Sequence, residues 1–290
     1  MPVRRLVGLA AVLAALLLLQ GVLAIRPAWA EAVEAPPLRV ALLPTNPPLS
    51  LLRLYDPFRQ FLSHRLQRPV ELYTARNFRT ALDDIRRGDF DVLVTAPHFG
   101  VIAVDAGYVP LARYKVELRP LIVVLKGSSL TEAAQLRGKK VLTANRLTAM
   151  SVVTEHWLES QYGLVAGRDY QLIDAQSHGT AIRAVGMGDA DACVSSVSAL
   201  QQVPEDVRAR VTFFEAGIAV PHQFTLAHPR LGERRIAELR QLMMDFNDTR
   251  EGKAFFAAGG FQGYSSLTAK DIEDARPYAD KVAKMIEDKP

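Results

Sequence analysis

The sequence predicts an α/β protein built from two doubly wound lobes, each a sheet covered by helices. Two observations lead to this prediction. Short apolar segments alternate with amphipathic segments between residues 38 and 95, and the same alternation starts again after residue 120. A Gly-Asp-x-Asp motif also follows a helical segment in both halves, at residues 88–91 and 188–191. Strands that alternate with helices in this way are typical of parallel sheets.

In the first unit, strands are predicted from short apolar or β-branched runs and helices from apolar residues at helical spacing. Gly88 is in position to end the second of these helices. In chain order we expect a strand at 38–43, a Pro-rich loop at 44–48, a helix at 57–66, a strand at 70–74, a helix at 78–87, a strand at 91–95 and a loop at 96–99.

The second unit follows the same rules, with Gly188 ending its second helix. In this unit we expect strands at 120–125, 139–143, 170–174 and 190–194, and helices at 150–162 and 180–187. The C-terminal part predicts two further helices, at 234–246 and 270–287.

The repeated alternation predicts two lobes, one of which is inserted into the other. The first lobe is expected to comprise residues 38–119 plus 220–290, and the second residues 120–219. Pro120 and Pro221 flank the inserted segment, so a hinge is expected at these two crossings, with a ligand cleft between the lobes. The alternative is that the two Gly-Asp-x-Asp motifs are coincidental turn chemistry.

Residues 1–30 are typical of a secretory signal peptide. Arg4 and Arg5 precede an uncharged apolar run over residues 6–25, and Ala28-Trp29-Ala30 offers a small-x-small cleavage site before Glu31. The alternative is an uncleaved anchor, because 20 apolar residues can span a bilayer. No cysteine follows the apolar run, so no lipid anchor is expected. A soluble periplasmic protein is therefore predicted.

Composition excludes several classes of function. Without residues 1–30 the chain has 32 Lys and Arg against 31 Asp and Glu, a net charge of +1, so no nucleic-acid surface is indicated. The single cysteine, Cys193, excludes an internal disulfide and every multi-cysteine zinc pattern. A small buried thiol is the expected role of Cys193.

Several stretches, in order along the chain, resemble the phosphate/phosphite/phosphonate-binding family of ABC transporters. The resemblance implies the type II periplasmic binding protein fold and a protein that captures a small oxyanion. The stretches that carry it are 68–72, 81–92, 95–97, 136–141, Ser177-His178 and 188–192.

The chain departs from this family in the segment that would hold the anion. The family usually has Ser-Thr-Ser-Gly at the start of the first helix of the second lobe, where hydroxyls and free backbone N–H groups bind oxygens. Here the corresponding residues are Leu147-Thr148-Ala149-Met150, followed by Ser151. A tyrosine common after Pro97 is replaced by Gly100. Phosphonate is therefore expected to bind poorly, and a flatter or less charged ligand is the alternative.

Ligands of doubly wound sheets bind beyond the carboxyl ends of the strands, and this rule selects the candidate ligand residues. They are His178, Thr148, Asn145, His98, Phe99, Ser151, Ser177, Ser195 and Thr45. His178 matches the Ser-His of the family, and Phe99 is expected to line the cleft. His98 either donates to an anion or caps a loop, and Arg146 either pairs with an anion or lies at the surface. Asn145 and Thr148 are also ordinary helix N-cap residues.

The leading prediction of function is a monomeric receptor that closes around an oxyanion and docks to a membrane ABC permease. A module that senses the same ligand for a membrane sensor kinase is the alternative. An enzyme is less favoured, since no nucleophile–base motif, phosphate loop or clustered carboxylates are found. No cofactor is expected. His98, His178 and His222 have no local metal-ligand spacing, so no metal site is expected either.

We predict that the mature protein begins at about Glu31, because the small-x-small motif ends at Ala30. Mass spectrometry of protein released by osmotic shock should give a chain that lacks residues 1–30. Recovery of the full-length chain in the membrane fraction would contradict the prediction.

Overall fold

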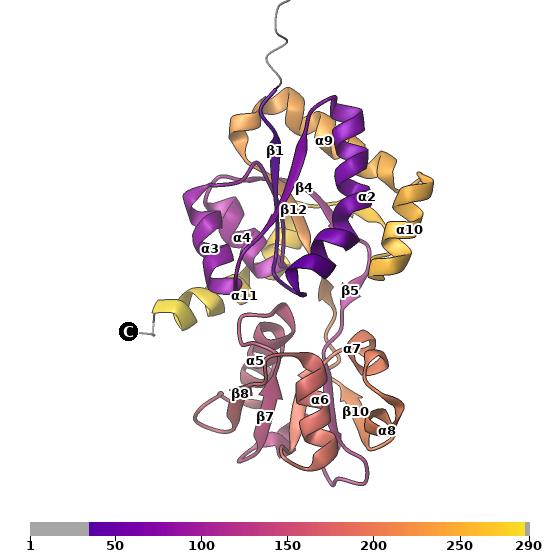
Figure 1. The fold of residues 1–290 in the computed structure, drawn as a ribbon. Coiled ribbons are helices and arrows are strands. Elements are labelled where there is room, and N and C mark those ends of the chain that lie inside the picture. Colours follow the sequence, from indigo (N-terminus) through magenta and orange to yellow (C-terminus); the bar gives the residue numbers. More distant parts are fainter. Residues whose placement is uncertain (1–34, 288–290) are drawn as a thin grey trace, which may run out of the picture. The chain divides into compact units, whose positions relative to one another are not determined.

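The computed structural model describes residues 35–287, so the predicted signal peptide lies outside the described residues. Two mixed sheets, each covered by helices on both faces, account for most of the described chain (Figure 1). We call the first sheet with its helices lobe 1 and the second sheet with its helices lobe 2. The helices of lobe 1 are α2 (Pro48–Leu66), α3 (Phe78–Arg87), α4 (Pro97–Asp105), α9 (Gly232–Phe246), α10 (Arg250–Gly259) and α11 (Ala269–Glu287), with a short 3₁₀ turn at Pro229–Leu231.

The sheet of lobe 1 has six strands, and its order shows that segments far apart in the sequence lie side by side. The order is β13 (Tyr264–Ser266), β4 (Val109–Tyr114), β12 (Phe224–Ala227), β3 (Val92–Thr95), β1 (Leu38–Leu42) and β2 (Val70–Thr74). The parallel sheet expected from the sequence is correct only for β3, β1 and β2. Strand β12 returns from lobe 2 and pairs antiparallel with both β3 and β4.

The sheet of lobe 2 has five strands and is mixed in the same way. Its order is β10 (Val211–Glu215), β6 (Leu121–Leu125), β9 (Ala192–Ser195), β7 (Lys140–Thr143) and β8 (Gln171–Asp174). Strands β9, β7 and β8 are parallel, whereas β6 is antiparallel to β9 and β10. Its helices are α5 (Ala149–Tyr162), α6 (His178–Met187), α7 (Val197–Gln202) and α8 (Glu205–Arg208), with a 3₁₀ turn at Ala133–Leu136.

Alternating side chains of the central strands fill separate cores on the two faces of each sheet, as the two-residue period of a strand requires. In lobe 1, Val40 packs with α2, α9 and α10, whereas Leu93 packs with α3, α4 and α11. In lobe 2, Val141 lies in the core under α5, and Leu142 lies in the core under α6, α7 and α8. Each sheet is therefore buried on both faces.

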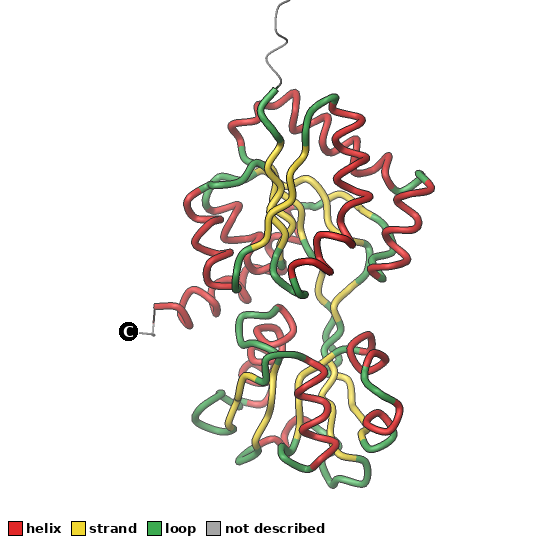
Figure 2. The backbone as a smooth tube through the Cα atoms, in the orientation of Figure 1, coloured by secondary structure: helices red, strands yellow, loops and turns green. Residues whose placement is uncertain are grey.

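Two short strands connect the sheets. The chain leaves lobe 1 through β5 (Glu117–Leu118) and returns through β11 (Val220–Pro221), and the two pair antiparallel (Figure 2). The sheet of lobe 1 takes its strands from residues 38–114 and 224–266, and the sheet of lobe 2 from residues 121–215. The domain boundaries expected from the sequence stay a prediction.

Two segments expected as loops are helical. Helix α2 begins at Pro48, nine residues before the expected start, and continues through Pro57. Helix α4 begins at Pro97, so His98 and Phe99 lie in its first turn. In both helices proline occupies the first helical position, where its missing N–H group leaves no hydrogen bond unmade. The sequence pattern predicts loops at both prolines, and the structure overturns this prediction.

The Gly-Asp-x-Asp motif makes the same turn in both lobes. Gly88 and Gly188 end α3 and α6 with left-handed backbone angles, φ 70° and φ 82°. The amide of Asp89 then donates to Asp84 at 3.2 Å, and that of Asp189 donates to Ala184 at 2.9 Å. A glycine adopts this conformation without the steric penalty of a Cβ atom.

The second aspartate of the motif joins neighbouring strands in both lobes. The Asp91 carboxylate accepts the amide N–H of Arg39 at the start of β1, at 2.9 Å. The Asp191 carboxylate accepts the amide N–H of Lys140 at the start of β7, at 2.8 Å. Each aspartate amide also donates to the carbonyl of the same basic residue, at 3.0 Å in both lobes. The repeated motif therefore holds two equivalent pairs of strands in register.

We predict that Asp91→Ala lowers the free energy of unfolding by about 2 kcal/mol, because it removes the acceptor of the Arg39 amide and of Nε of Arg230. Asp83→Ala, which removes an exposed carboxylate of α3, is the matched control and should change it by less than about 0.5 kcal/mol. Urea denaturation followed by circular dichroism measures both. Equal effects of the two variants would contradict the role given to Asp91.

Candidate functional site

The parallel strands of lobe 2 end at one edge of the sheet, where several candidate residues follow them. Strand β7 ends at Thr143 and leads through Asn145 and Thr148 into α5, while β8 leads through Ser177 into α6. Strand β9 ends at Ser195. Because carboxyl ends of parallel strands share an edge, this topology gathers the loops that the sequence analysis selected in lobe 2.

The N-terminus of α5 is capped by its own loop. The hydroxyl of Thr148 accepts the amide N–H of Ser151 at 3.3 Å and donates to the carbonyl of Asn145 at 2.9 Å. The amide oxygen of Asn145 accepts the N–H of Leu147 at 2.9 Å. Both side chains therefore already serve the local cap, and the free donors at this helix start are the backbone N–H groups of Ala149 and Met150, for which the described residues offer no acceptor.

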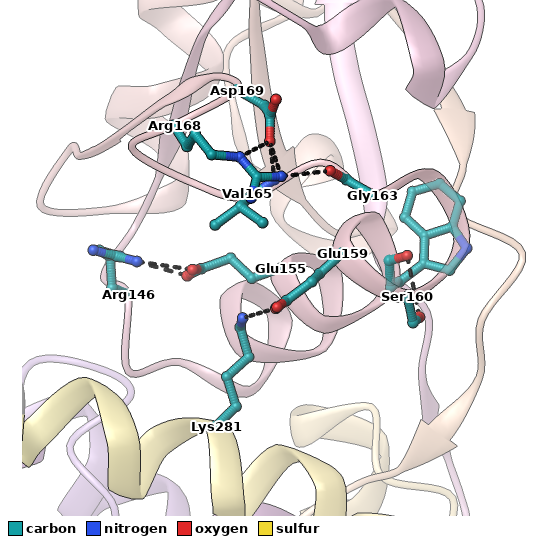
Figure 3. A network of polar contacts seen from close by, with 10 residues as sticks. Arg146, Glu155, Glu159, Ser160, Gly163, Val165, Arg168, Asp169 and Lys281 are labelled. Carbon is teal, nitrogen blue, oxygen red and sulfur yellow. Dashed lines mark hydrogen bonds and ion pairs between the residues drawn. The ribbon is translucent and has the colours of Figure 1, made fainter.

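Arg146 is engaged inside lobe 2 (Figure 3). Its guanidinium donates to the Glu155 carboxylate at 2.8 Å, and its backbone N–H donates to Asp174 at 3.0 Å. The side chain of Glu155 is only 4% exposed, and its hydrogen bond raises the pKa of Arg146. If Arg146 turned toward a ligand, it would leave a buried carboxylate unpaired, which is strongly unfavourable. The sequence leaves two roles open for Arg146, pairing with an anion or lying at the surface. This geometry does not fit the first of them.

His178 has an available ring nitrogen. It is the first residue of α6, after the N-cap Ser177, whose hydroxyl accepts the N–H of Thr180 at 3.1 Å. The His178 ring hydrogen-bonds the backbone of Val194, whereas its Nδ1 is buried without a partner among the described residues. Burial lowers the pKa of His178 below the usual value of 6.5. In a neutral ring that carries its proton on Nε2, the unpartnered Nδ1 is a hydrogen-bond acceptor.

Buried hydroxyls without partners also occur at this edge. Ser195 at the end of β9 and Ser151 in the first turn of α5 are fully buried, and within the described chain neither hydroxyl has a hydrogen-bond partner. Thr143 at the end of β7 has the same property, although the sequence analysis did not select it. Its position as the last residue of a predicted strand could have identified it. Buried hydroxyls normally have partners, so these groups are candidates for contact with water or ligand.

His98 and Phe99 belong to lobe 1, where both are buried. His98 is 1% exposed, and its Nε2 lies 3.1 Å from the carbonyl oxygen of Leu147. Burial lowers the pKa of His98 to about 4, so the neutral ring donates this hydrogen bond to the loop before α5. Phe99 has no exposed surface and lies in the core with α3 and α11. It therefore has no surface for a ligand in this conformation, contrary to the expected role as a cleft wall.

Helix α5 also contacts lobe 1 through α11. Figure 3 shows Lys281 of α11 directed at Glu159 of α5, and their charged atoms are 2.7 Å apart. The rings of His156 and Tyr278 meet edge to face at 5.4 Å. Val152 of α5 is fully buried in the core that contains α4 and α11. The helix whose N-terminus was expected to hold the ligand is thus also the main contact of lobe 2 with lobe 1.

The remaining ligand candidate, Thr45, lies in lobe 1 apart from this edge, and His222 and Cys193 are packed inside the protein. Thr45 is exposed between β1 and α2, where its N–H donates to the Leu43 carbonyl at 2.8 Å. His222 is partly buried beside the ring of Tyr114, and desolvation lowers its pKa to about 4. Cys193 is buried in β9, and burial raises the pKa of its thiol to about 12.

Two features of residues 35–287 concern metal ions and membranes. No group of three His, Cys, Asp or Glu side chains in this part of the chain is placed to hold a metal ion. None of the helices described has the length and apolar character needed to cross a membrane.

A cavity of about 80 Å³ lies in lobe 1 between α3 and the ends of β1, β2 and β3. Its walls are mostly apolar, and the candidate residues do not line it. We therefore do not assign it as the ligand site.

Comparison with known proteins gives a family match over residues 40–272, to the periplasmic substrate-binding proteins of phosphonate ABC transporters. A methylphosphonate complex of PhnD1 from Prochlorococcus marinus is similar in fold, with a TM-score of 0.70, 18% identity and coverage of 85% of this chain and 98% of that chain. An ATP complex of XAC2383 from Xanthomonas citri is also similar in fold, with a TM-score of 0.72 and 14% identity. The match covers 86% of this chain and 98% of that chain. At these identities the structural likeness establishes the fold.

The buried histidines predict a loss of stability in acid. With a pKa of about 4 in the folded protein against about 6.5 in the unfolded chain, His98 binds fewer protons when folded. The contribution of neutral His98 to the free energy of unfolding is therefore complete above pH 6.5. It falls by about 3 kcal/mol as the pH is lowered to 4. His98→Gln keeps a donor for Leu147 without titrating, so its unfolding free energy should fall less steeply over this range.

His64→Gln is the matched control, because His64 is exposed on α2. It should keep the pH dependence of the parent protein in urea denaturation between pH 4 and 7. The assigned role of His98 is wrong if His98→Gln also keeps it.

Proposed function

The chain belongs to the periplasmic substrate-binding proteins of phosphonate ABC transporters, since the family match covers residues 40–272, and we propose that it binds a small oxyanion at the carboxyl edge of the lobe 2 sheet. The bound form would be presented to an ABC permease. The observation that carries the proposal is the buried, unpartnered Nδ1 of His178 at this edge. A bound ligand would supply the partner that this nitrogen lacks.

The backbone of α5 supports an anion as the ligand. The N–H groups of Ala149 and Met150 point out of the helix start, which carries a partial positive charge. Thr148 and Asn145 contribute indirectly in this proposal, because their side chains hold the helix start in shape. Ser151 and Ser195 are buried nearby in lobe 2 with free hydroxyls.

The chemistry of His178 restricts the ligand. While the ring is neutral, Nδ1 accepts a hydrogen bond, so the ligand must bring a hydroxyl, as a protonated oxyanion does. Alternatively a fully ionised anion binds with the imidazolium, which the anion itself would favour by raising the pKa of His178. Formation of the imidazolium takes up a proton, and so does binding of a ligand that is deprotonated in solution but bound with its hydroxyl. For such ligands, binding at pH 8 should be weaker than at pH 6, whereas a ligand that keeps its hydroxyl at both pH values should bind equally well.

The altered segment 147–150 favours a ligand other than a typical phosphonate. Leu147 and Ala149 pack against the apolar core of lobe 1, where the family usually has serine hydroxyls. An apolar contact cannot replace hydrogen bonds to ligand oxygens. We therefore propose an oxyanion that is flatter or less charged than a phosphonate.

The role in transport rests on the family, and export through a cleaved signal peptide rests on residues 1–30. We infer a binding role without catalysis, supported by the raised pKa of the buried Cys193 and by the engagement of His98 with Leu147. A monomer and the lobe boundaries 38–119 plus 220–290 and 120–219 belong to the same proposal. Supply of a signal to a sensor kinase stays the alternative, which the neighbouring genes would decide.

We predict that calorimetric titration of the mature protein with phosphate, phosphite, methylphosphonate, arsenite and sulfate identifies at least one binder. For the best of these, His178→Ala should weaken binding about tenfold or more, as expected for the loss of a hydrogen bond to a charged group. His64→Ala, at an exposed position on α2, should leave the affinity unchanged. If no oxyanion binds, or if His178→Ala binds within twofold of the parent protein, the proposed site is wrong.

A further inference from the structure

The two crossings between the lobes are short and are paired with each other. Leu118 of β5 lies opposite Val220 of β11, and Glu117 lies opposite Pro221. Movement of one lobe against the other must bend the chain at these crossings. The direction of the movement therefore depends on how the crossings are held where they leave lobe 1.

The residues that attach the two crossings to lobe 1 also contact each other. Tyr114 is the last residue of β4 before the first crossing, and Gln223 follows the second crossing just before β12. The amide N–H of Tyr114 donates to the carbonyl of Gln223 at 3.3 Å. Tyr114 is fully buried and Gln223 is 9% exposed. We call Tyr114 and Gln223 the hinge roots.

Tyr55 of α2 joins the side chains of both hinge roots. Its hydroxyl lies 2.8 Å from the Tyr114 hydroxyl and donates to Oε1 of Gln223 at 3.1 Å. A phenol has one proton, so Tyr114 must be the donor to Tyr55. Tyr55 is 2% exposed, and burial raises its pKa, so the hydroxyl keeps its proton. The result is a buried chain of hydrogen bonds that water does not replace easily.

Aromatic packing holds the first hinge root against lobe 1. The Tyr114 ring stacks on Phe261 at 4.1 Å with an interplanar angle of 4°, and on Tyr264 at 5.0 Å with an angle of 17°. The next residue, Lys115, donates its N–H to the carbonyl of Gly263 at 2.9 Å. The first crossing thus leaves a rigid base, to which the Tyr55 hydroxyl connects the second crossing.

We propose that Tyr55 is a positioning residue of the hinge: its hydroxyl keeps the two hinge roots in register, so that bending is confined to residues 117–120 and 218–222. Tyr55 lies in the core of lobe 1 and touches no candidate ligand residue. The proposal rests on the two-lobed architecture and does not depend on which ligand binds. It can be tested on the ligand-free protein.

Tyr55→Phe removes the hydroxyl and keeps the ring. Tyr108→Phe is the matched control, because Tyr108 is also 2% exposed in lobe 1 and donates to the carbonyl of Phe90, away from the crossings. In hydrogen exchange, Tyr55→Phe should speed exchange of the Tyr114 and Lys115 amides about tenfold or more, as loss of a buried partner implies. Tyr108→Phe should leave these two amides at the parent rate.

The interlobe distance tests the positioning role directly. Spin labels at Asp83→Cys in lobe 1 and Ser129→Cys in lobe 2 occupy exposed positions, and the native Cys193 is fully buried. Pulsed electron resonance should give a broader interlobe distance distribution in Tyr55→Phe than in the parent and in Tyr108→Phe. Gln223→Met, which removes the acceptor, should broaden it as well and serves if Tyr55→Phe does not fold. Equal widths in all four proteins would overturn the proposal.

Discussion

A carboxylate that accepts the backbone N–H at the start of a central strand is the interaction on which both lobes depend. Asp91 makes this contact with Arg39, and Asp191 makes it with Lys140. Each bond fixes the register between two parallel strands, and a slip of one residue would turn every side chain to the other face of the sheet. The cores of both lobes and the edge with His178 therefore share this constraint.

Several polar side chains expected to bind the ligand are instead engaged in hydrogen bonds within the protein. Thr148 and Asn145 cap α5, and Arg146 neutralises a buried carboxylate. The polar groups that stay free are backbone N–H groups of α5, buried hydroxyls and Nδ1 of His178. Such a site has few fixed charges, which is consistent with a ligand less charged than a phosphonate.

The contacts between the lobes connect the site to the hinge. Helix α5 starts at the site and meets lobe 1 through Val152 and Glu159, and the carbonyl of Leu147 just before the helix accepts from His98. Any change in the relative position of the lobes must alter these contacts as well as bend the crossings. In the proposed site, a ligand at the start of α5 would touch the same helix that makes these contacts between the lobes.

The sequence by itself determined the features that local chemistry specifies. Helix ends at Gly88 and Gly188, the cap at Thr148 and the parallel cores of both sheets follow from periodicity and turn residues within a few positions. The tertiary structure alone decided the antiparallel insertion of β12, the burial of Phe99 and the pairing of Arg146 with Glu155. These depend on which distant segment covers a residue, and proline at 48 and 97 can begin a helix or sit in a loop. Hydrophobic periodicity carries no information about such partners, because it records which face is apolar and not what packs on it.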